Sequence, residues 1–160
     1  MVCYNSPMKK IIVISDSHGN KECVNKVLQQ DFDYLFFLGD GLSDLGTSIY
    51  DDRVKAVKGN WDYNETARQD IVMQVEGVMF FLTHGHMYGV KETIFRLYDR
   101  VKELNPDVVL FGHTHKCEDF VFNGIRFVNP GALSARRGGL YTYLIINVEG
   151  DKYYIEKHSF

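Results

Sequence analysis

Five short apolar segments of this chain each run directly into a turn that carries side chains able to bind metal or phosphate. The segments are rich in β-branched and aromatic residues and too short for helices, which predicts buried β-strands. They are Ile11–Ser15, Tyr34–Leu38, Val54–Val57, Val78–Leu82 and Val108–Phe111. Ligands of open α/β sheets bind beyond the carboxyl ends of the strands, where neighbouring loops converge. If these strands are neighbours, the five turns form one crevice.

Between and after these strands the sequence pattern predicts two helices and three hairpins. Apolar residues at helical spacing indicate helices from Lys21 to Gln30 and from Val90 to Leu104. The hairpin turns are Glu76-Gly77, Asn123-Gly124 and Glu149-Gly150-Asp151. Strands alternating with helices early and hairpins late predict a mixed α/β domain of the α+β type. We expect two sheets packed face to face, with helices outside.

Length and charge limit the function classes that fit the chain. With 160 residues we expect one domain over 1–160, in which 1–7 is a flexible extension and Met8 an alternative start. Eighteen basic and 21 acidic side chains give a net charge of -3, which argues against a broad nucleic-acid surface. A small phosphate-bearing substrate is not excluded, because bound metal ions supply positive charge locally.

Cysteine usage and hydropathy indicate a cytoplasmic protein. The three cysteines, Cys3, Cys23 and Cys117, show no paired spacing, which predicts free thiols in a reducing compartment. The N-terminal residues lack the apolar core of a signal peptide, and the run Ile11–Ile14 is far too short for a membrane span. We therefore expect no membrane association.

The polar turns hold two carboxylates, one amide and several imidazoles. These candidates are Asp16, His18, Asp40, Asn60, His84, His86, His113 and His115. Each turn alone has an ordinary explanation as a helix cap or loop, although two histidines directly after a buried strand are costly to explain structurally. Five such turns in a row favour a metal centre for Mn, Fe or Zn, since calcium prefers more oxygens and structural zinc prefers thiolates. The donors are too many for one ion, which predicts two ions sharing a bridging carboxylate.

The ordered set of turns resembles the calcineurin-like metallophosphoesterase superfamily. The resemblance rests on Asp16-x-His18, Gly39-Asp40, Gly59-Asn60, Thr83-His84-Gly85-His86 and Gly112-His113-Thr114-His115. Together with Asn129-Pro130-Gly131 and the small size, these turns are similar to the small YfcE-type phosphodiesterase subfamily. The resemblance implies a β-sandwich flanked by helices, with the metals at one end of the sheets.

The resemblance also implies a ligand set. The first ion is expected on Asp16, His18, Asp40 and His115, and the second on Asp40, Asn60, His84 and His113. Asp40 would then bridge the two ions, and His86 would contact the substrate. We expect Mn²⁺ first, with Fe, Zn, Ni or Mg as alternatives.

One position departs from the superfamily pattern. Where many members carry a histidine after Gly-Asn, this chain has Trp61, followed by Asp62. Indole has no titratable proton for a leaving group, which favours diesters or good leaving groups over alkyl monoesters. Trp61 either stacks on an aromatic group of the substrate or covers the core. Asp62 is interpreted as orienting a ligand histidine.

Substrate contacts are expected from four side chains. They are Asn60, Trp61, His86 and Arg136. Arg136 and Arg137 are an adjacent pair that could clamp a phosphate, although a solvated loop is the commoner explanation.

These observations predict a metal-dependent phosphodiesterase. A hydroxide bridging the two ions would attack phosphorus in line, with Asp40, Asn60 and His86 as catalytic residues. The alternatives are a phosphomonoesterase or nucleotide-polyphosphate hydrolase, and a protein-interaction scaffold similar to the retromer subunit VPS29. A scaffold need not keep every donor, so seven competent ligand positions favour the enzyme. We further expect a small homo-oligomer.

Overall fold

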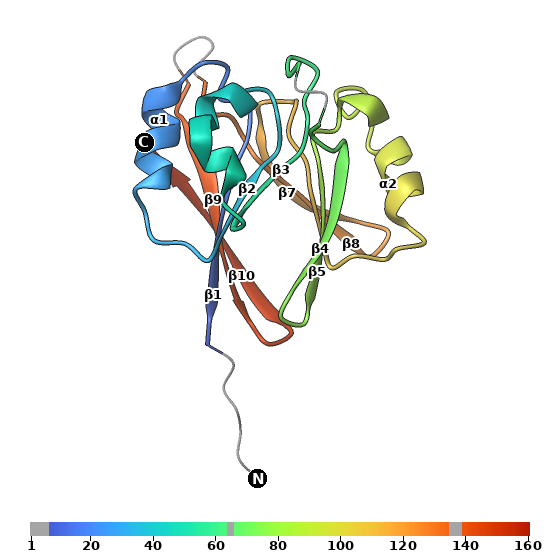
Figure 1. Ribbon diagram of the computed structural model, residues 1–160. Helices are drawn as coiled ribbons and strands as arrows, with labels where there is room; N and C mark the ends of the chain where they lie inside the picture. Colours follow the sequence, from blue (N-terminus) through green and yellow to red (C-terminus); the bar gives the residue numbers. More distant parts are fainter. Residues whose placement is uncertain (1–6, 64–65, 135–138) are drawn as a thin grey trace.

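The computed structural model describes residues 7–63, 66–134 and 139–160 and contains two five-stranded sheets packed face to face (Figure 1). The first sheet has the strand order β10-β9-β1-β2-β3 and the second β4-β5-β6-β8-β7. The first sheet is built from β1 (Lys9–Ile14), β2 (Tyr34–Phe37), β3 (Val54–Ala56), β9 (Thr142–Glu149) and β10 (Lys152–Ser159). The second contains β4 (Asp70–Val75), β5 (Val78–Thr83), β6 (Val108–Leu110), β7 (Cys117–Phe122) and β8 (Ile125–Pro130). The expected two-sheet fold is confirmed. The extension expected over 1–7 lies outside the described residues, apart from Pro7.

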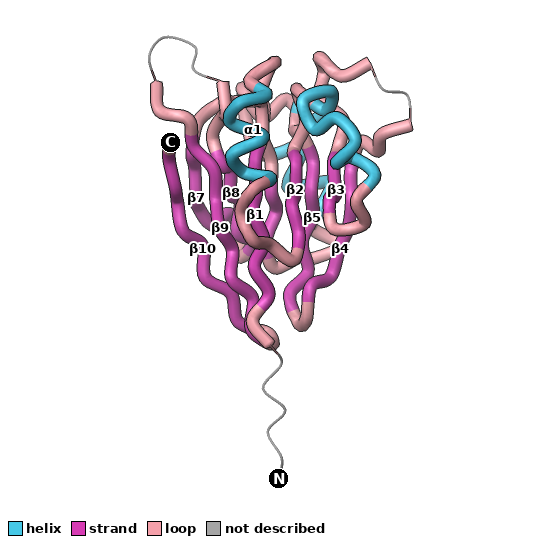
Figure 2. The backbone as a smooth tube through the Cα atoms, turned by 60° about the vertical axis from the view of Figure 1, so that its left-hand side comes forward, coloured by secondary structure: helices cyan, strands magenta, loops and turns pink. Residues whose placement is uncertain are grey.

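From Ile11 to Ile14, strand β1 is buried on both faces, which explains the unbroken apolar sequence of these four residues. Ile11 and Val13 face the second sheet in the inter-sheet core, whereas Ile12 and Ile14 face helix α1 (Lys21–Leu28) and the 3₁₀ segment η1 (Leu42–Tyr50). Strand β1 runs parallel to β2 and antiparallel to β9, so it occupies the centre of its sheet. Figure 2 shows α1 in front of this strand.

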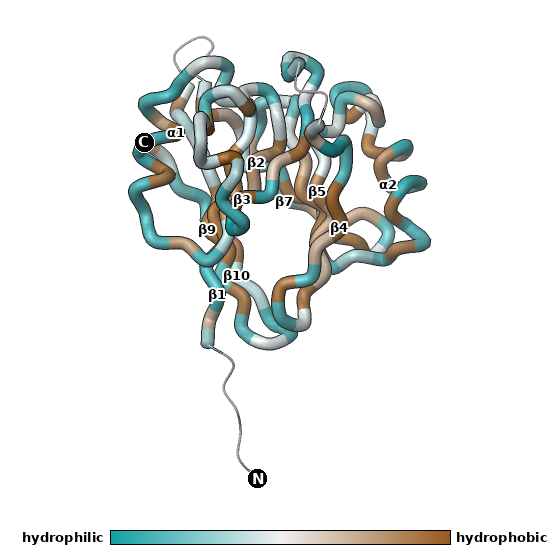
Figure 3. The backbone as a smooth tube through the Cα atoms, in the orientation of Figure 1, coloured by the Kyte–Doolittle hydropathy of each residue, from teal (hydrophilic) through white to brown (hydrophobic). Residues whose placement is uncertain are grey.

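The inter-sheet core is apolar and contains paired aromatic rings. Phe36 of β2 and Phe80 of β5 meet edge to face, with ring centroids 5.8 Å apart. Hydrophobic residues follow the central strands, and hydrophilic residues gather in the outer loops (Figure 3). A membrane-spanning helix is not found in the part of the chain that the structure describes.

Helix α2 is shorter than the sequence predicts. It spans Phe95–Val101 and packs Leu97 and Val101 against the outer face of the second sheet. The expected helix from Val90 to Leu104 is wrong at both ends. Ile94 stands at the N-cap without a capping side-chain hydrogen bond, and Leu104 is 39% exposed. The helical spacing of apolar residues extends beyond the residues that pack against the second sheet, so the spacing alone predicts too long a helix.

The strands that precede the candidate donors end at the same end of the sandwich. Strands β1, β2 and β3 run parallel in one sheet, and β5 and β6 run parallel in the other. Their carboxyl-terminal loops lie together at the end opposite the start of β1 (Figure 1). The polar turns therefore meet at the end of the sandwich, between the two sheets, and not along the edge of a single sheet.

Candidate metal centre

Five candidate ligands sit in the left-handed backbone region, which non-glycine residues rarely adopt. Their φ angles are 53° for Asp16, 44° for His18, 60° for Asp40, 69° for His113 and 62° for His115. In the described part of the chain only three further non-glycine residues have positive φ. Strained backbone of this kind persists where the surroundings hold it in place and gathers at functional sites. Backbone hydrogen bonds from Asp16 N–H to the Gly39 carbonyl and from His18 N–H to the Asp40 carbonyl hold the loops together.

The first group of donors is Asp16, His18 and His115, whose ligand atoms lie within 4.8 Å of one another. Asp16 Oδ1 lies 3.0 Å from His115 Nε2 and 3.6 Å from His18 Nε2, and the two histidine nitrogens are 3.2 Å apart. Asp16 Oδ1 is buried without a neighbour in hydrogen-bonding geometry among the described residues. The other oxygen, Oδ2, is held by Ser15 Oγ and by the His113 N–H. One carboxylate oxygen is thus fixed by the protein, and the other points at two imidazoles.

The second group is Asp40, His84 and His113, again within 4.8 Å. The fully buried His84 places Nδ1 2.6 Å from the Leu38 carbonyl, which can only accept a hydrogen bond. Nδ1 therefore carries a proton, and Nε2 is the nitrogen available to a metal. His84 Nε2 lies 3.2 Å from Asp40 Oδ2 and 3.1 Å from Asn60 Oδ1.

Asp40 lies between the two groups. Its Oδ2 is 3.2 Å from His84 Nε2 in the second group and 3.6 Å from His18 Nε2 in the first. Its Oδ1 accepts the backbone N–H of Trp61 at 2.8 Å. The geometry suits the bridging role that was expected for this carboxylate.

The pKa values of these groups are displaced by burial and by one another. Burial raises the pKa of Asp16, but the nearby imidazoles of His115 and His18 favour the charged carboxylate more strongly, so the net pKa is lowered. Burial lowers the pKa of His84, and the hydrogen bond to Asp40 and the charges of Asp16 and Asp40 reverse the sign, giving a raised pKa. Burial and the neighbouring positive charge of His84 lower the pKa of His113 to about 4. His113 is therefore neutral at neutral pH, with a lone pair free for a metal.

Asp62 has a different role from the one that the sequence suggested. Its buried carboxylate accepts four backbone N–H groups, at 2.7 to 3.0 Å, and among the described residues these are its hydrogen-bond donors in place of a histidine. The donors are Asp40, Gly41, Leu42 and Gly59. Asp62 thus joins the loop after β2 to the loop after β3.

Two further positioning side chains escaped the sequence reasoning. Asp44 accepts hydrogen bonds from Ser17 Oγ at 2.5 Å and from the Gly19 N–H at 2.8 Å, which holds the first loop against η1. Asn129 donates to the Gly112 carbonyl and to Thr114 Oγ1, which holds the His113–His115 loop. Only Asn129 could have been found from the sequence, because it belongs to the Asn129-Pro130-Gly131 turn.

The residues expected to contact the substrate differ in where they lie relative to the two donor groups. His86 opens the short segment η2 (His86–Tyr88) and lies beside His84, with ring centroids 5.3 Å apart. Its Nδ1 is buried and has no hydrogen-bond partner among the described residues. Trp61 is 58% exposed, so it does not cover the core. Arg136 lies outside the described residues.

A face-to-face sandwich with carboxylate, amide and imidazole donors at the carboxyl ends of its strands has the architecture of a metal-dependent hydrolase. The chain belongs to the calcineurin-like phosphoesterase superfamily, whose domain pattern matches residues 8–151. The probable metallophosphoesterase YsnB of Bacillus subtilis is 31% identical over 146 residues, covering 88% of this chain and 85% of that protein. Phosphodiesterase YfcE of Escherichia coli K12 is 28% identical over 162 residues, covering 82% and 83%. The resemblance to this superfamily and the expectation of a metal-dependent phosphoesterase are confirmed.

Solved structures share the fold. A predicted phosphoesterase from Streptococcus pneumoniae matches with a TM-score of 0.84 and 25% identity, over 96% of this chain and 91% of that one. Vacuolar Protein Sorting 29 from Cryptosporidium parvum matches with a TM-score of 0.73 and 18% identity, over 96% and 98%. The second match shows a common fold and nothing more.

Proposed function

We propose that this protein is a phosphodiesterase that binds two divalent ions, the first on Asp16, His18, Asp40 and His115 and the second on Asp40, Asn60, His84 and His113. The observation that carries the proposal is Asp40 Oδ2, which faces a histidine nitrogen of each donor group. A second support is Asp16 Oδ1, a buried oxygen without a hydrogen bond in the described structure. Both oxygens lie close to imidazole nitrogens, which supports their assignment as metal ligands.

When bound, the two ions supply Lewis acidity and an activated water for in-line displacement at phosphorus. The chain supplies the rest of the geometry. Asp62 and Asp44 fix the ligand loops, and the Leu38 carbonyl fixes the tautomer of His84. Asn60 lies at the exposed edge of the centre, where its amide can also contact a phosphate oxygen. We assign His86 to the substrate side, because its ring centroid lies 5.3 Å from that of His84 and 6.2 Å from that of His113, and its Nδ1 has no hydrogen-bond partner among the described residues.

The preference for diesters rests on Trp61. An alkyl monoester needs a proton for its leaving oxygen, and indole cannot give one. Replacing Trp61 with histidine should therefore raise monoesterase activity relative to diesterase activity. An unchanged ratio would show that this position does not set the preference.

The decisive experiment is a metal-supplemented screen over mono-, di- and pyrophosphate esters. We expect Mn²⁺-dependent hydrolysis of an activated aryl phosphodiester, and its loss in Asp40→Ala and His84→Ala. His158→Ala is the matched control, because this histidine lies on β10 next to Glu156 and outside the centre. A wild-type protein without metal-dependent hydrolysis would refute the enzyme and favour the scaffold alternative.

Some expectations stay predictions. These are Mn²⁺ as the native ion, a cytoplasmic location, a single domain over 1–160 and a small homo-oligomer. The free thiols of the buried Cys23 and the half-buried Cys117 are in keeping with a reducing compartment.

A further inference from the structure

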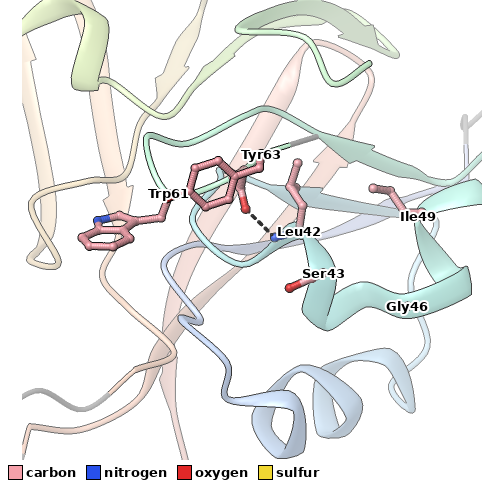
Figure 4. Close-up of a pocket in the computed structure, with 7 residues that line it drawn as sticks. Leu42, Ser43, Gly46, Ile49, Trp61 and Tyr63 are labelled. Atoms are coloured by element: carbon pink, nitrogen blue, oxygen red, sulfur yellow. Dashed lines mark hydrogen bonds between the residues drawn. The ribbon is translucent and has the colours of Figure 1, made fainter. Parts of the chain in front are cut away.

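A cavity of about 360 Å³ lies beside the candidate metal centre. Its size falls within the usual range of small-molecule sites, about 300–1,000 Å³. It is lined by Leu42, Ser43, Gly46, Ile49, Trp61, Asp62 and Tyr63. Figure 4 shows that Trp61 and Tyr63 project from one loop, while Leu42 and Ile49 come from η1.

Trp61 links the cavity to the metal centre, because its side chain lines the cavity and its backbone contacts a candidate ligand. The Trp61 N–H donates to Asp40 Oδ1, and Trp61 directly follows Asn60, the expected ligand of the second ion. Consecutive Cα atoms are about 3.8 Å apart, so a residue that lines the cavity directly adjoins an expected metal ligand. A group attached to a phosphate at the centre can therefore reach it.

The lining suits an uncharged, planar ring. Its surface combines two aromatic rings with two aliphatic side chains, and none of the described lining residues is basic. Asp62 is the single charged residue of the lining, and its carboxylate already accepts hydrogen bonds from four backbone N–H groups. Bases stack on aromatic side chains because every base has a π-face. The exposed hydroxyl of Ser43 can hydrogen-bond to the edge of such a ring.

The exposure of the two aromatic residues supports the same conclusion. Trp61 is 58% exposed and Tyr63 is 85% exposed, so neither ring is needed to fill the core. Large aromatic side chains left open next to a catalytic centre are available to a ligand.

We propose that this cavity is a subsite for the nucleobase of a nucleotide ester, with Trp61 and Tyr63 stacking on the base. The inference rests on the proposed function, since it takes the phosphate to lie at the metal centre. It narrows the substrate class from phosphodiesters in general to those of a nucleoside.

The protein carries its own probe, because Trp61 is the single tryptophan of the sequence. In the presence of Mg²⁺, adenosine 5′-monophosphate should quench and shift the Trp61 emission. Ribose 5-phosphate, which has the same sugar and phosphate without the base, should leave it unchanged. Equal responses to the two compounds would overturn the proposal.

Two tyrosines form a matched pair of variants. Tyr63 and Tyr50 are 85% and 86% exposed, and only Tyr63 lines the cavity. Tyr63→Ala should weaken adenosine 5′-monophosphate binding by about two- to tenfold. Tyr50→Ala should not change it. Equal effects of the two variants would refute the subsite.

Calorimetry of Trp61→Ala, which lacks the fluorophore, should show at least about a fivefold loss of affinity for adenosine 5′-monophosphate. An unchanged affinity would overturn the stacking role. The two proposals fail separately. Metal-dependent hydrolysis without selectivity for the base would remove the subsite alone, whereas base-selective quenching without any hydrolysis would remove the enzyme and keep the subsite.

Discussion

Asp62 shapes the metal centre without being an expected ligand. Its two oxygens hold four backbone N–H groups from the loops that carry Asp40 and Asn60. A buried N–H left without an acceptor costs about 1–3 kcal/mol, so the carboxylate stabilises the loops as well as orienting them.

Asp62→Asn should lower metal affinity by about 10–100-fold, the usual cost of losing a group that orients metal ligands. The reason is that the asparagine NH₂ cannot accept the N–H groups of Asp40 and Gly59, which bind Asp62 Oδ2. Metal titration by calorimetry measures the loss. Asp52→Asn, at an exposed aspartate, is the control. Equal affinities in the two variants would refute the positioning role.

His84 makes metal binding depend on pH. Its pKa in the metal-free protein is raised, since Asp40 and Asp16 outweigh the effect of burial. Below that pKa the imidazole is positively charged and opposes the ion, and above it Nε2 is free. Metal affinity should therefore increase as pH rises through and above the ordinary histidine range.

Proton release provides the measurement. Near neutral pH, the binding enthalpy of Zn²⁺ or Mn²⁺ should differ between buffers of different protonation enthalpy. His158→Ala should show the same buffer dependence as wild type. A binding enthalpy independent of buffer would contradict the raised pKa of His84.

For single residues, the sequence reveals the candidate metal ligands better than the side chains that hold the ligand loops in place. Asp16, Asp40 and the histidines stand out because each follows an apolar run. Asp44 and Asp62 do not stand out, because their partners are backbone N–H groups of loops that only the folded chain brings close.

Among the elements, helix α1 is fixed by its N-cap residue, Asn20. The Asn20 side chain accepts the Cys23 N–H at 3.2 Å and donates to the Leu133 carbonyl at 2.7 Å. One side chain therefore caps the helix and also attaches it to the segment after β8.

Asn20→Ala should reduce the free energy of unfolding by about 2 kcal/mol, about one from the cap and one from the bond to Leu133. Asn20→Asp keeps the acceptor and loses the donor, so it should recover roughly half. Denaturant titration of both variants separates the two contributions. Equal losses in both would show that the cap does not contribute.

Elements with simple periodicity were predictable, and irregular ones were not. The hairpin at Asn123-Gly124 was predicted because Asn-Gly favours two positive φ angles, here 47° and 80°. Segment η1 was missed, because Gly46 interrupts it at φ 54° and ψ −133° and breaks the helical spacing. Helix α2 was overextended, since spacing alone does not show where its sheet ends.

For the molecule as a whole, the centre joins the two sheets. Asp16, Asp40 and Asn60 follow strands of the first sheet, whereas His84 and His113 follow strands of the second. Bound ions would therefore link the two layers of the sandwich at one end.

Metal binding should raise the thermal midpoint of the whole domain. An ion present at about 100 times its dissociation constant adds about 2.7 kcal/mol to the free energy of unfolding. Calorimetric scans with Mn²⁺ and with a chelator measure the difference. Asp40→Ala should remove the metal-induced shift, and a shift that persists in this variant would place the stabilising ion elsewhere.

The pairing of β1 with β9 brings together residues far apart in sequence, such as Lys9 and Val148. During synthesis, the first strand is made long before its antiparallel neighbour, and one of its edges stays open until residues 142–149 have left the ribosome. Contacts of such large sequence separation slow folding. Until then the nascent chain exposes an apolar strand edge, the kind of surface that chaperones protect. The strand that precedes Asp16 is therefore synthesised first but is among the last to have both of its edges paired.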